Sequence, residues 1–173
     1  MRALCAAILA GLLLAGCGSS GGKGGGKVTC PAAFVAPGLD SYTQLRPGAT
    51  SGGLDDIAFG VKVVSVKAAC KSELGGIHIT TSIIFHAVRN DDSLQQGDFT
   101  YFVAIADAQQ NILAKQTFGL RADFARKQKQ MRIADEISEH LPLKKGAGGV
   151  GYAVIIGMQL SPQQIENRQQ HTP

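Results

Sequence analysis

The sequence predicts an all-β fold: a single antiparallel β-sandwich, immunoglobulin- or fibronectin-like, with a short C-terminal helix. Three observations predict it. Apolar residues recur at every second position over most of the chain after residue 55. Turn-forming residues such as Gly75 and Gly76 separate these segments. No helical segments alternate with the strands, which argues against a parallel sheet. The chain has no Trp, so the core tryptophan of antibody domains is absent, which favours a looser relative of that sandwich.

The strands are placed by this alternation and by the turns between them. In the second long strand, for example, Ile77, Ile79 and Ile83 share one face. A polar loop precedes the central hairpin, and a second polar segment forms its turn. Strands are predicted over residues 57–70, 77–85, 99–106, 112–124 and 152–160.

Residues 131–141 fit two patterns. Ile133 and Ile137 have helical spacing, whereas Met131, Ile133 and Ile137 also share strand parity. We favour a strand because the neighbouring segments are strands.

The chain closes with a helix signal. Ser161 is a good N-cap, Pro162 suits the first turn, and Gln164 occupies the capping-box position. The sequence therefore predicts a short helix that ends near Gln169.

The N-terminus has the pattern of a secretory signal peptide over residues 1–16. Arg2 precedes an apolar run from Ala3 to Ala15, which is shorter than the ~20 residues that span a bilayer. Residues 14–17, Leu-Ala-Gly-Cys, resemble the lipobox of bacterial lipoproteins. This resemblance implies that Cys17 carries a diacylglyceryl group, begins the mature chain and is acylated on its amine, with palmitate as the expected chain. An ordinary cleaved signal peptide or a buried helix is the alternative.

The lipobox also implies a location. Lipoproteins kept in the inner membrane commonly carry Asp after the modified cysteine, whereas this chain has Gly18. We therefore expect a lipid-anchored protein of the bacterial cell envelope, at the periplasmic face of the outer membrane rather than in the inner membrane. Residues 17–29 form a Gly/Ser-rich flexible tether, and residues 30–170 form one sandwich domain.

Two cysteines remain for the domain, because Cys5 leaves with the signal peptide and Cys17 is lipidated. In an oxidising compartment Cys30 and Cys70 are expected to form a disulfide. It would join the start of the domain to the end of its first long strand. The alternatives are a metal-binding pair, which lacks nearby partners, or two free thiols.

Three segments resemble small uncharacterised lipoproteins of Gram-negative envelopes. They are CPAAFV, YFVAIADAQQNILAKQTF and GMQLSPQQIENR, at residues 30–35, 101–118 and 157–168. The resemblance covers most of the mature chain and supports the domain boundaries, but its motifs carry no known chemistry.

The usual signatures of catalysis and of cofactor binding are missing from the sequence. His78 and His86 lie about 26 Å apart along one strand, and His140 and His171 lack ligand spacing. The acidic groups, including Asp135, fit solvated turns and strand ends better than a calcium loop, although carboxylates from different loops could still converge. No serine elbow or free cysteine is present. We expect no catalytic residues, no metal site and no cofactor.

One basic cluster follows a strand. It consists of Arg121, Arg126, Lys127, Lys129 and Arg132, and the fold could add Lys144 and Lys145. It could contact anionic lipid or an acidic patch on a partner, although a solvated turn is the simpler explanation.

The charge balance is modest. Removal of Arg2 with the signal leaves 16 basic against 13 acidic residues, which is no indication of nucleic-acid binding. We expect a non-enzymatic module, anchored to the membrane by lipid, that binds another envelope protein. The alternative is a carrier or sensor of lipids or other anions that uses the basic cluster.

Overall fold

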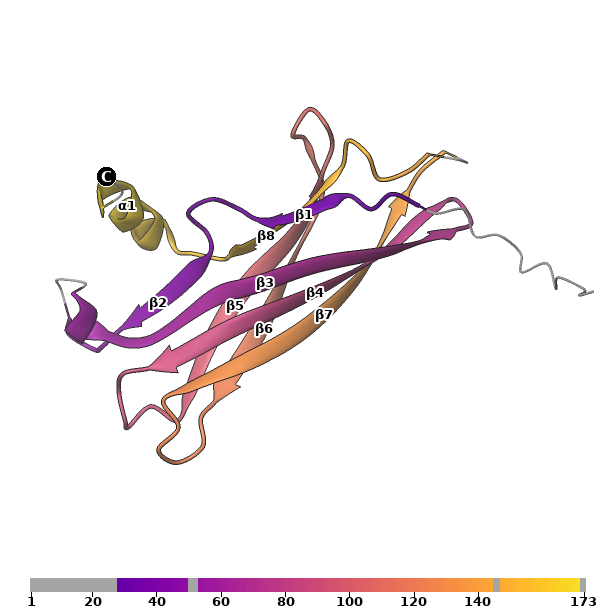
Figure 1. Cartoon of the computed structure of the whole chain (residues 1–173). Coiled ribbons are helices and arrows are strands. Elements are labelled where there is room, and N and C mark those ends of the chain that lie inside the picture. The colour runs from indigo at the N-terminus through magenta and orange to yellow at the C-terminus, as the bar shows by residue number, and fades with distance from the viewer. Residues whose placement is uncertain (1–27, 50–52, 145–146, 172–173) are drawn as a thin grey trace, which may run out of the picture.

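Two four-stranded sheets pack face to face (Figure 1) in the computed structural model, which describes residues 28–49, 53–144 and 147–171. The first sheet has the order β1 (Ala32–Val35), β8 (Ala153–Met158), β5 (Gln96–Ala106), β6 (Ile112–Asp123). The second has the order β2 (Ser41–Leu45), β3 (Ile57–Glu73), β4 (Gly76–Arg89), β7 (Gln130–Pro142). The 3-10 turn η1 (Leu54–Asp56) and the helix α1 (Pro162–His171) complete the described elements. The predicted all-β sandwich is confirmed.

The core forms where the inward faces of the two sheets meet. Along β4, buried and half-buried residues alternate over the whole strand, and Ile77, Ile79, Ile83 and Phe85 are fully buried. Such strict alternation is what a strand needs when one face packs on a second sheet. Tyr101 of β5 packs against Phe85 with ring centroids 4.9 Å apart, which joins the sheets at the centre.

The connectivity is that of a Greek-key sandwich. From β3 to β8 the strands occupy the places of A, B, C, C′, E and F in an immunoglobulin-type domain. The place of the last strand, beside β8, is taken by β1, which runs parallel to β8 from Ala32 to Val35. All other described pairs are antiparallel, so this pair is the one departure from the expected antiparallel sheets.

Most predicted elements are confirmed, and two strands were missed. Residues 131–141 lie in β7, which pairs with β4 along its length. The predicted capping box is present: the N–H of Ser161 donates to Gln164 Oε1 (2.9 Å), and the N–H of Gln164 donates to Ser161 Oγ (3.3 Å). The short strands β1 and β2 were not predicted, because they contain four and five residues between Pro and Gly turns.

Helix α1 covers the outer edge of β2. Gln164 donates from its amide to the carbonyl oxygen of Thr43 (2.9 Å), and Arg168 donates to the carbonyl oxygens of Gly38 (2.6 Å) and Ser41. A helix over an edge strand prevents pairing with a second chain there. Within the described residues, no helix has the length and apolar character required to cross a bilayer.

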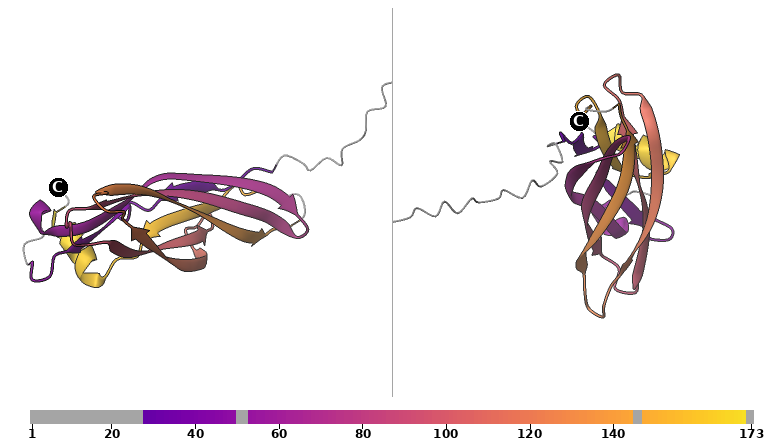
Figure 2. Two further views of the ribbon diagram at one scale, coloured as in Figure 1. Left: turned by 90° about the horizontal axis from the view of Figure 1, so that it is seen from below. Right: turned by 90° about the vertical axis from the view of Figure 1, so that its right-hand side faces the viewer.

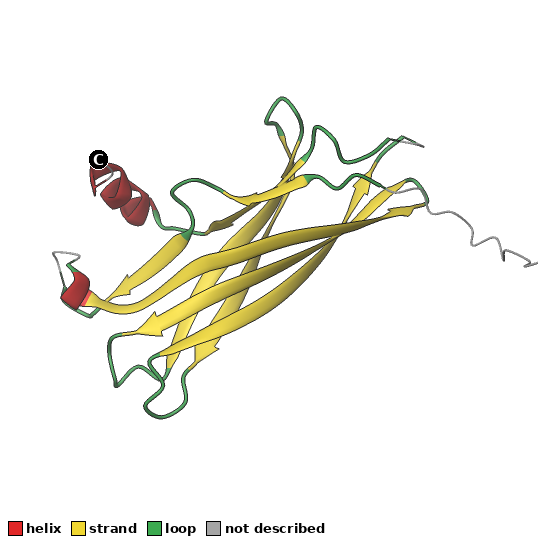
Figure 3. Ribbon diagram, viewed as in Figure 1, coloured by secondary structure: helices red, strands yellow, loops and turns green. Residues whose placement is uncertain are grey.

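The sandwich is elongated, and its two ends differ (Figure 2). We call the end at which the described chain begins the near end. It comprises residues 28–31, the β3–β4 turn, the β5–β6 turn and the β7–β8 loop. The far end comprises the loop residues 46–49, 53–56, 90–95 and 124–129, and Figure 3 shows the loops gathered at both ends. Strand β4 has 14 residues and so separates the ends by about 45 Å.

A disulfide between Cys30 and Cys70 closes the near end, with the Cα atoms 5.5 Å apart. This confirms the predicted pairing and its place at the end of the first long strand. The N–H of Gly149 donates to the carbonyl oxygen of Thr29 (2.8 Å), so the β7–β8 loop also holds the first described residues. The predicted signal peptide, the predicted lipobox with Cys17 and the predicted tether up to residue 27 lie outside the described residues.

Candidate interaction surface at the far end

A buried arginine organises the far end. Arg89, the last residue of β4, is only 3% exposed. Its guanidinium donates hydrogen bonds to the carbonyl oxygens of Leu94 (2.5 Å), Gln128 (2.7 Å) and Ala125 (3.3 Å). It also lies 5.3 Å from the centre of the Phe124 ring, a distance typical of a cation–π contact. One side chain therefore holds the β4–β5 loop and the β6–β7 turn in fixed positions.

A second arginine joins the third loop of this end. Arg46 donates to the carbonyl oxygens of Asp55 (3.0 Å) and Asn90 (3.1 Å) and lies 3.5 Å from the carboxylate of Asp91. Asp91 also accepts hydrogen bonds from the hydroxyl and backbone N–H of Ser93, and these bonds lower the pKa of its carboxyl. The three far-end loops are thus fixed relative to one another.

Two members of the predicted basic cluster are engaged in ion pairs. Arg121 of β6 donates from Nε to Asp98 Oδ1 at 2.6 Å, and Lys129 pairs with Asp92. These bonds lower the pKa of both carboxyls. Because the pairs are solvent-exposed, they orient the side chains more than they stabilise the fold.

The remaining far-end cations stand without an ion-pair partner in the described part of the chain. Arg126 and Lys127 form the exposed tip of the β6–β7 turn, which is closed by a hydrogen bond from the N–H of Gln128 to the carbonyl oxygen of Ala125 (2.9 Å). Arg132 follows on the outer face of β7, opposite His86. The turn thus presents unpaired positive charge on a rigid base.

Lys127 has an unusual backbone, with φ of 67°. This left-handed conformation favours glycine and costs other residues about 1 kcal/mol. A lysine at this position is therefore unfavourable for the turn itself, as is Gln110 in the β5–β6 turn, with φ of 64°.

The extension of the cluster to Lys144 is wrong. Lys144 follows the end of β7 at the near end, whereas Lys129 precedes its start. The 13 residues of β7 place the two about 43 Å apart. Lys145 lies outside the described residues.

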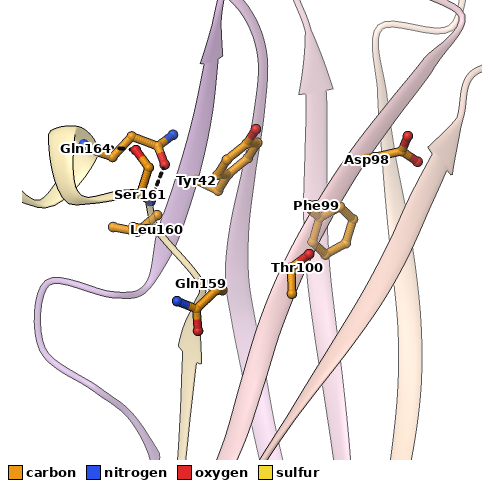
Figure 4. A pocket seen from close by; sticks show the side chains of 8 residues that line it. All are labelled: Tyr42, Asp98, Phe99, Thr100, Gln159, Leu160, Ser161 and Gln164. Carbon is orange, nitrogen blue, oxygen red and sulfur yellow. Dashed lines mark hydrogen bonds between the residues drawn. The ribbon is translucent and has the colours of Figure 1, made fainter.

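A shallow hollow of about 420 Å³ lies beside this surface (Figure 4). It is lined by Tyr42, Asp98, Phe99, Thr100, Gln159, Leu160, Ser161 and Gln164. Ser161 and Gln164 are committed to the capping box, and Asp98 to its ion pair. Burial, with a smaller effect of the Asp98 charge, raises the pKa of the Tyr42 hydroxyl. These groups do not form a nucleophile with a base beside it.

The histidines are less scattered than their positions in the sequence indicate. His78 of β4 lies directly opposite His140 of β7. Both rings approach the carboxylate of Glu73, with Nδ1 at 3.9 Å and 3.7 Å respectively. Cross-strand register brings them together, which residue spacing alone does not show. No set of three or more metal-ligating side chains in the described ranges has a geometry that would hold a metal ion.

Two carboxylates face the interior, contrary to the expectation that the acidic groups are solvated. Asp135 accepts a hydrogen bond from the Tyr101 hydroxyl (2.6 Å), and burial together with this bond raises the pKa of Tyr101. Glu139 is 9% exposed, its Oε2 has no hydrogen-bond partner among the described residues, and burial raises its pKa. Both share the inward parity of Ile133 and Ile137, which was the signal available in the sequence.

Comparisons with known proteins add little to this picture. No family model and no curated protein matches the chain. A crystal structure of a DUF1425 family member from Shewanella sp. pv-4 is similar at 11% sequence identity and a TM-score of 0.31. The match covers 65% of this chain and 86% of that one.

Proposed function

We propose that this protein is a lipid-anchored lipoprotein of the bacterial envelope whose domain binds another envelope protein without catalysing a reaction. In this proposal Cys17 carries the lipid, residues 17–29 are the tether, and the outer membrane is the anchoring membrane. The far-end loops form the binding surface.

The observation that carries the proposal is the rigid far end. Arg89 and Arg46 fix three loops through hydrogen bonds to backbone oxygens, and Arg126 and Lys127 are left unpaired at the tip. A surface whose loops are already ordered loses little conformational entropy on binding. It also lies at the end opposite to Val28, where a tethered domain points away from its anchor.

The alternative, a carrier or sensor of lipids or other anions, has less support. Its basic cluster is divided: Asp98 and Asp92 pair with two members, and Lys144 lies at the other end. The unpaired cations also lie farthest from the anchoring membrane. Charge reversal at Arg126, Lys127 and Lys129 tests this alternative, which requires liposome or polyanion binding to be lost.

Site-specific photo-crosslinking in intact cells tests the protein-binding proposal. A photoreactive residue at position 127 should give a reproducible protein adduct. The matched control is Lys67, an exposed lysine in the middle of β3, which should give none. With the photoreactive residue at position 129 instead, the protein adduct should be lost when Arg126→Glu and Lys127→Glu are introduced together. Identical adduct patterns from positions 127 and 67 would contradict a far-end binding surface.

The anchor is tested separately. Cys17→Ala should release the protein from membranes and abolish processing that is sensitive to globomycin. Membrane retention of this variant would contradict the lipoprotein assignment.

A further inference from the structure

Four large apolar side chains project from the turns of the near end. Leu74 is fully exposed at 102%, Val150 at 76%, Ile112 at 54% and Leu113 at 52%. They come from three connections: the β3–β4 turn, the β7–β8 loop and the β5–β6 turn, which Ile112 and Leu113 follow as the first residues of β6. Exposed apolar side chains gathered on one surface commonly mark a contact with a partner or a membrane.

These three connections form one continuous rim. The N–H of Leu143 donates to the carbonyl oxygen of Gly75 (2.9 Å), which joins the start of the β7–β8 loop to the β3–β4 turn. A Cβ atom added at Gly151 of the same loop would lie 3.7 Å from the Cβ of Ala108, so this loop runs close to the β5–β6 turn. Figure 1 shows the loop running between the two turns, beside the first described residues.

The rim carries two carboxylates. Glu73 lies 3.5 Å from the ammonium of Lys71, whereas Asp107 accepts hydrogen bonds from the side chain and backbone of Asn111 and from the N–H of Gln109, which lower the pKa of its carboxyl. The β7–β8 loop contributes Lys144, which matches the anionic surface of a bilayer. The far end, in contrast, carries charged side chains in all three of its loops.

The length of the N-terminal segment before Val28 indicates which surface can cover this rim. Twenty-seven residues precede Val28 and leave the domain at this end, and Cys17 lies eleven positions before Val28. A Gly-rich tether of that length, as proposed above, would span about 18 Å, so a lipid on Cys17 would hold the rim close to the bilayer surface.

We propose that the near end docks on the bilayer, with Leu74, Val150, Ile112 and Leu113 entering the headgroup region and Lys144 beside the lipid phosphates. This inference rests on the proposed lipid anchor. Burial of these apolar side chains, in addition to the acyl chains, then fixes the orientation of the domain on the membrane.

The absence of Trp from the chain provides a direct test. The full-length lipidated protein is reconstituted in vesicles of phosphatidylethanolamine and phosphatidylglycerol, with single substitutions Leu74→Trp or Val150→Trp as probes. Each probe should emit at shorter wavelength than in detergent-free buffer, and lipids brominated in the acyl chain should quench it about twofold or more. The matched control is Leu54→Trp, which is 84% exposed at the far end and should be unaffected.

The outcomes separate the two proposals. If the protein sediments with the vesicles but the Leu74 and Val150 probes behave like the Leu54 probe, docking of the rim is wrong and the anchor stands. If the protein does not sediment with vesicles at all, both are wrong. Leu74→Ser with Val150→Ser should leave the lipidated protein bound but increase the rotational freedom of a spin label at position 67; unchanged mobility would also overturn docking.

Discussion

At the near end the loops meet around a covalent bond, whereas at the far end they are held by hydrogen bonds from two arginines. The near end presents four exposed apolar side chains and few charges, whereas the far end presents mostly charged side chains around the exposed Leu54. One sandwich thus orders its two sets of loops by different chemistry. The difference matches the two tasks we propose, attachment at one end and recognition of a protein at the other.

The largest change is expected from removing the covalent bond. Cys30→Ser with Cys70→Ser opens a loop of 40 residues and should lower the free energy of unfolding by about 4 kcal/mol, because the unfolded chain gains entropy. Urea denaturation of the oxidised wild type and the variant measures this. Ser72→Ala on the same strand is the control. A loss below about 1 kcal/mol would show that the near end does not depend on the disulfide.

The corresponding change at the far end is Arg89→Met. It keeps the aliphatic stem but leaves three backbone oxygens without their donor, and should cost about 3 kcal/mol. Hydrogen exchange should accelerate in the β4–β5 loop and the β6–β7 turn and stay unchanged at the near end. Arg89→Lys keeps the charge and should recover part of the loss. Uniform acceleration over both ends would contradict a local role for Arg89.

A smaller effect is expected from Glu139, which lies toward the near end of β7. Glu139→Gln should stabilise the domain by about 1 kcal/mol at pH 7, because a buried, incompletely bonded carboxylate no longer has to be charged. Burial raises the folded-state pKa above the ordinary 4.5. The stability that Glu139 contributes is therefore fully present below pH 4.5 and is lost as the pH rises through the folded pKa.

The gain from Glu139→Gln should accordingly grow with pH and disappear in acid. Denaturation midpoints across this range measure it, with Glu136→Gln on the outer face of the same strand as the control. A gain that does not vary with pH would show that the charge of Glu139 is not the cause.

The smallest effect concerns the tip of the far end. Lys127→Gly should stabilise the fold by about 0.5 kcal/mol, because relief of the left-handed strain outweighs the freedom that glycine gains in the unfolded chain. Arg126→Gly, at a position without positive φ, should instead destabilise it slightly. Thermal denaturation measures both. If Lys127→Gly also weakens crosslinking from position 129, the lysine side chain contributes to binding although its backbone conformation reduces the stability of the turn.

The sequence allowed the long strands and the helix cap to be predicted because their signals are local. Alternation from Ile77 to Phe85 and the Ser161–Gln164 spacing act within one element. The disulfide followed from counting cysteines. In contrast, β1 fills the place of a last strand by pairing with a segment more than a hundred residues away, and no local pattern shows that.

The site was harder to predict than the fold. His78 meets His140 only through the register of β4 and β7, so their spacing in the sequence was uninformative. Arg89 had a usable signal, because it shares the inward parity of Phe85 and Ala87. The basic cluster was recognised from neighbouring positions along the chain, but the ion pairs of Lys129 with Asp92 and of Arg121 with Asp98 depend on segments from elsewhere.

The position of the Cys30–Cys70 bond also determines how the domain withstands mechanical pull. Tension on a tether at the N-terminus would otherwise act first on β1, which pairs with β8 over only four residues. The disulfide passes that load to Cys70, inside the seventeen-residue strand β3, whose pairing with β4 extends from Phe59 to Glu73. If the chain is anchored at its N-terminus as we propose, force on the anchor would load β3 before it could separate the four paired residues of β1.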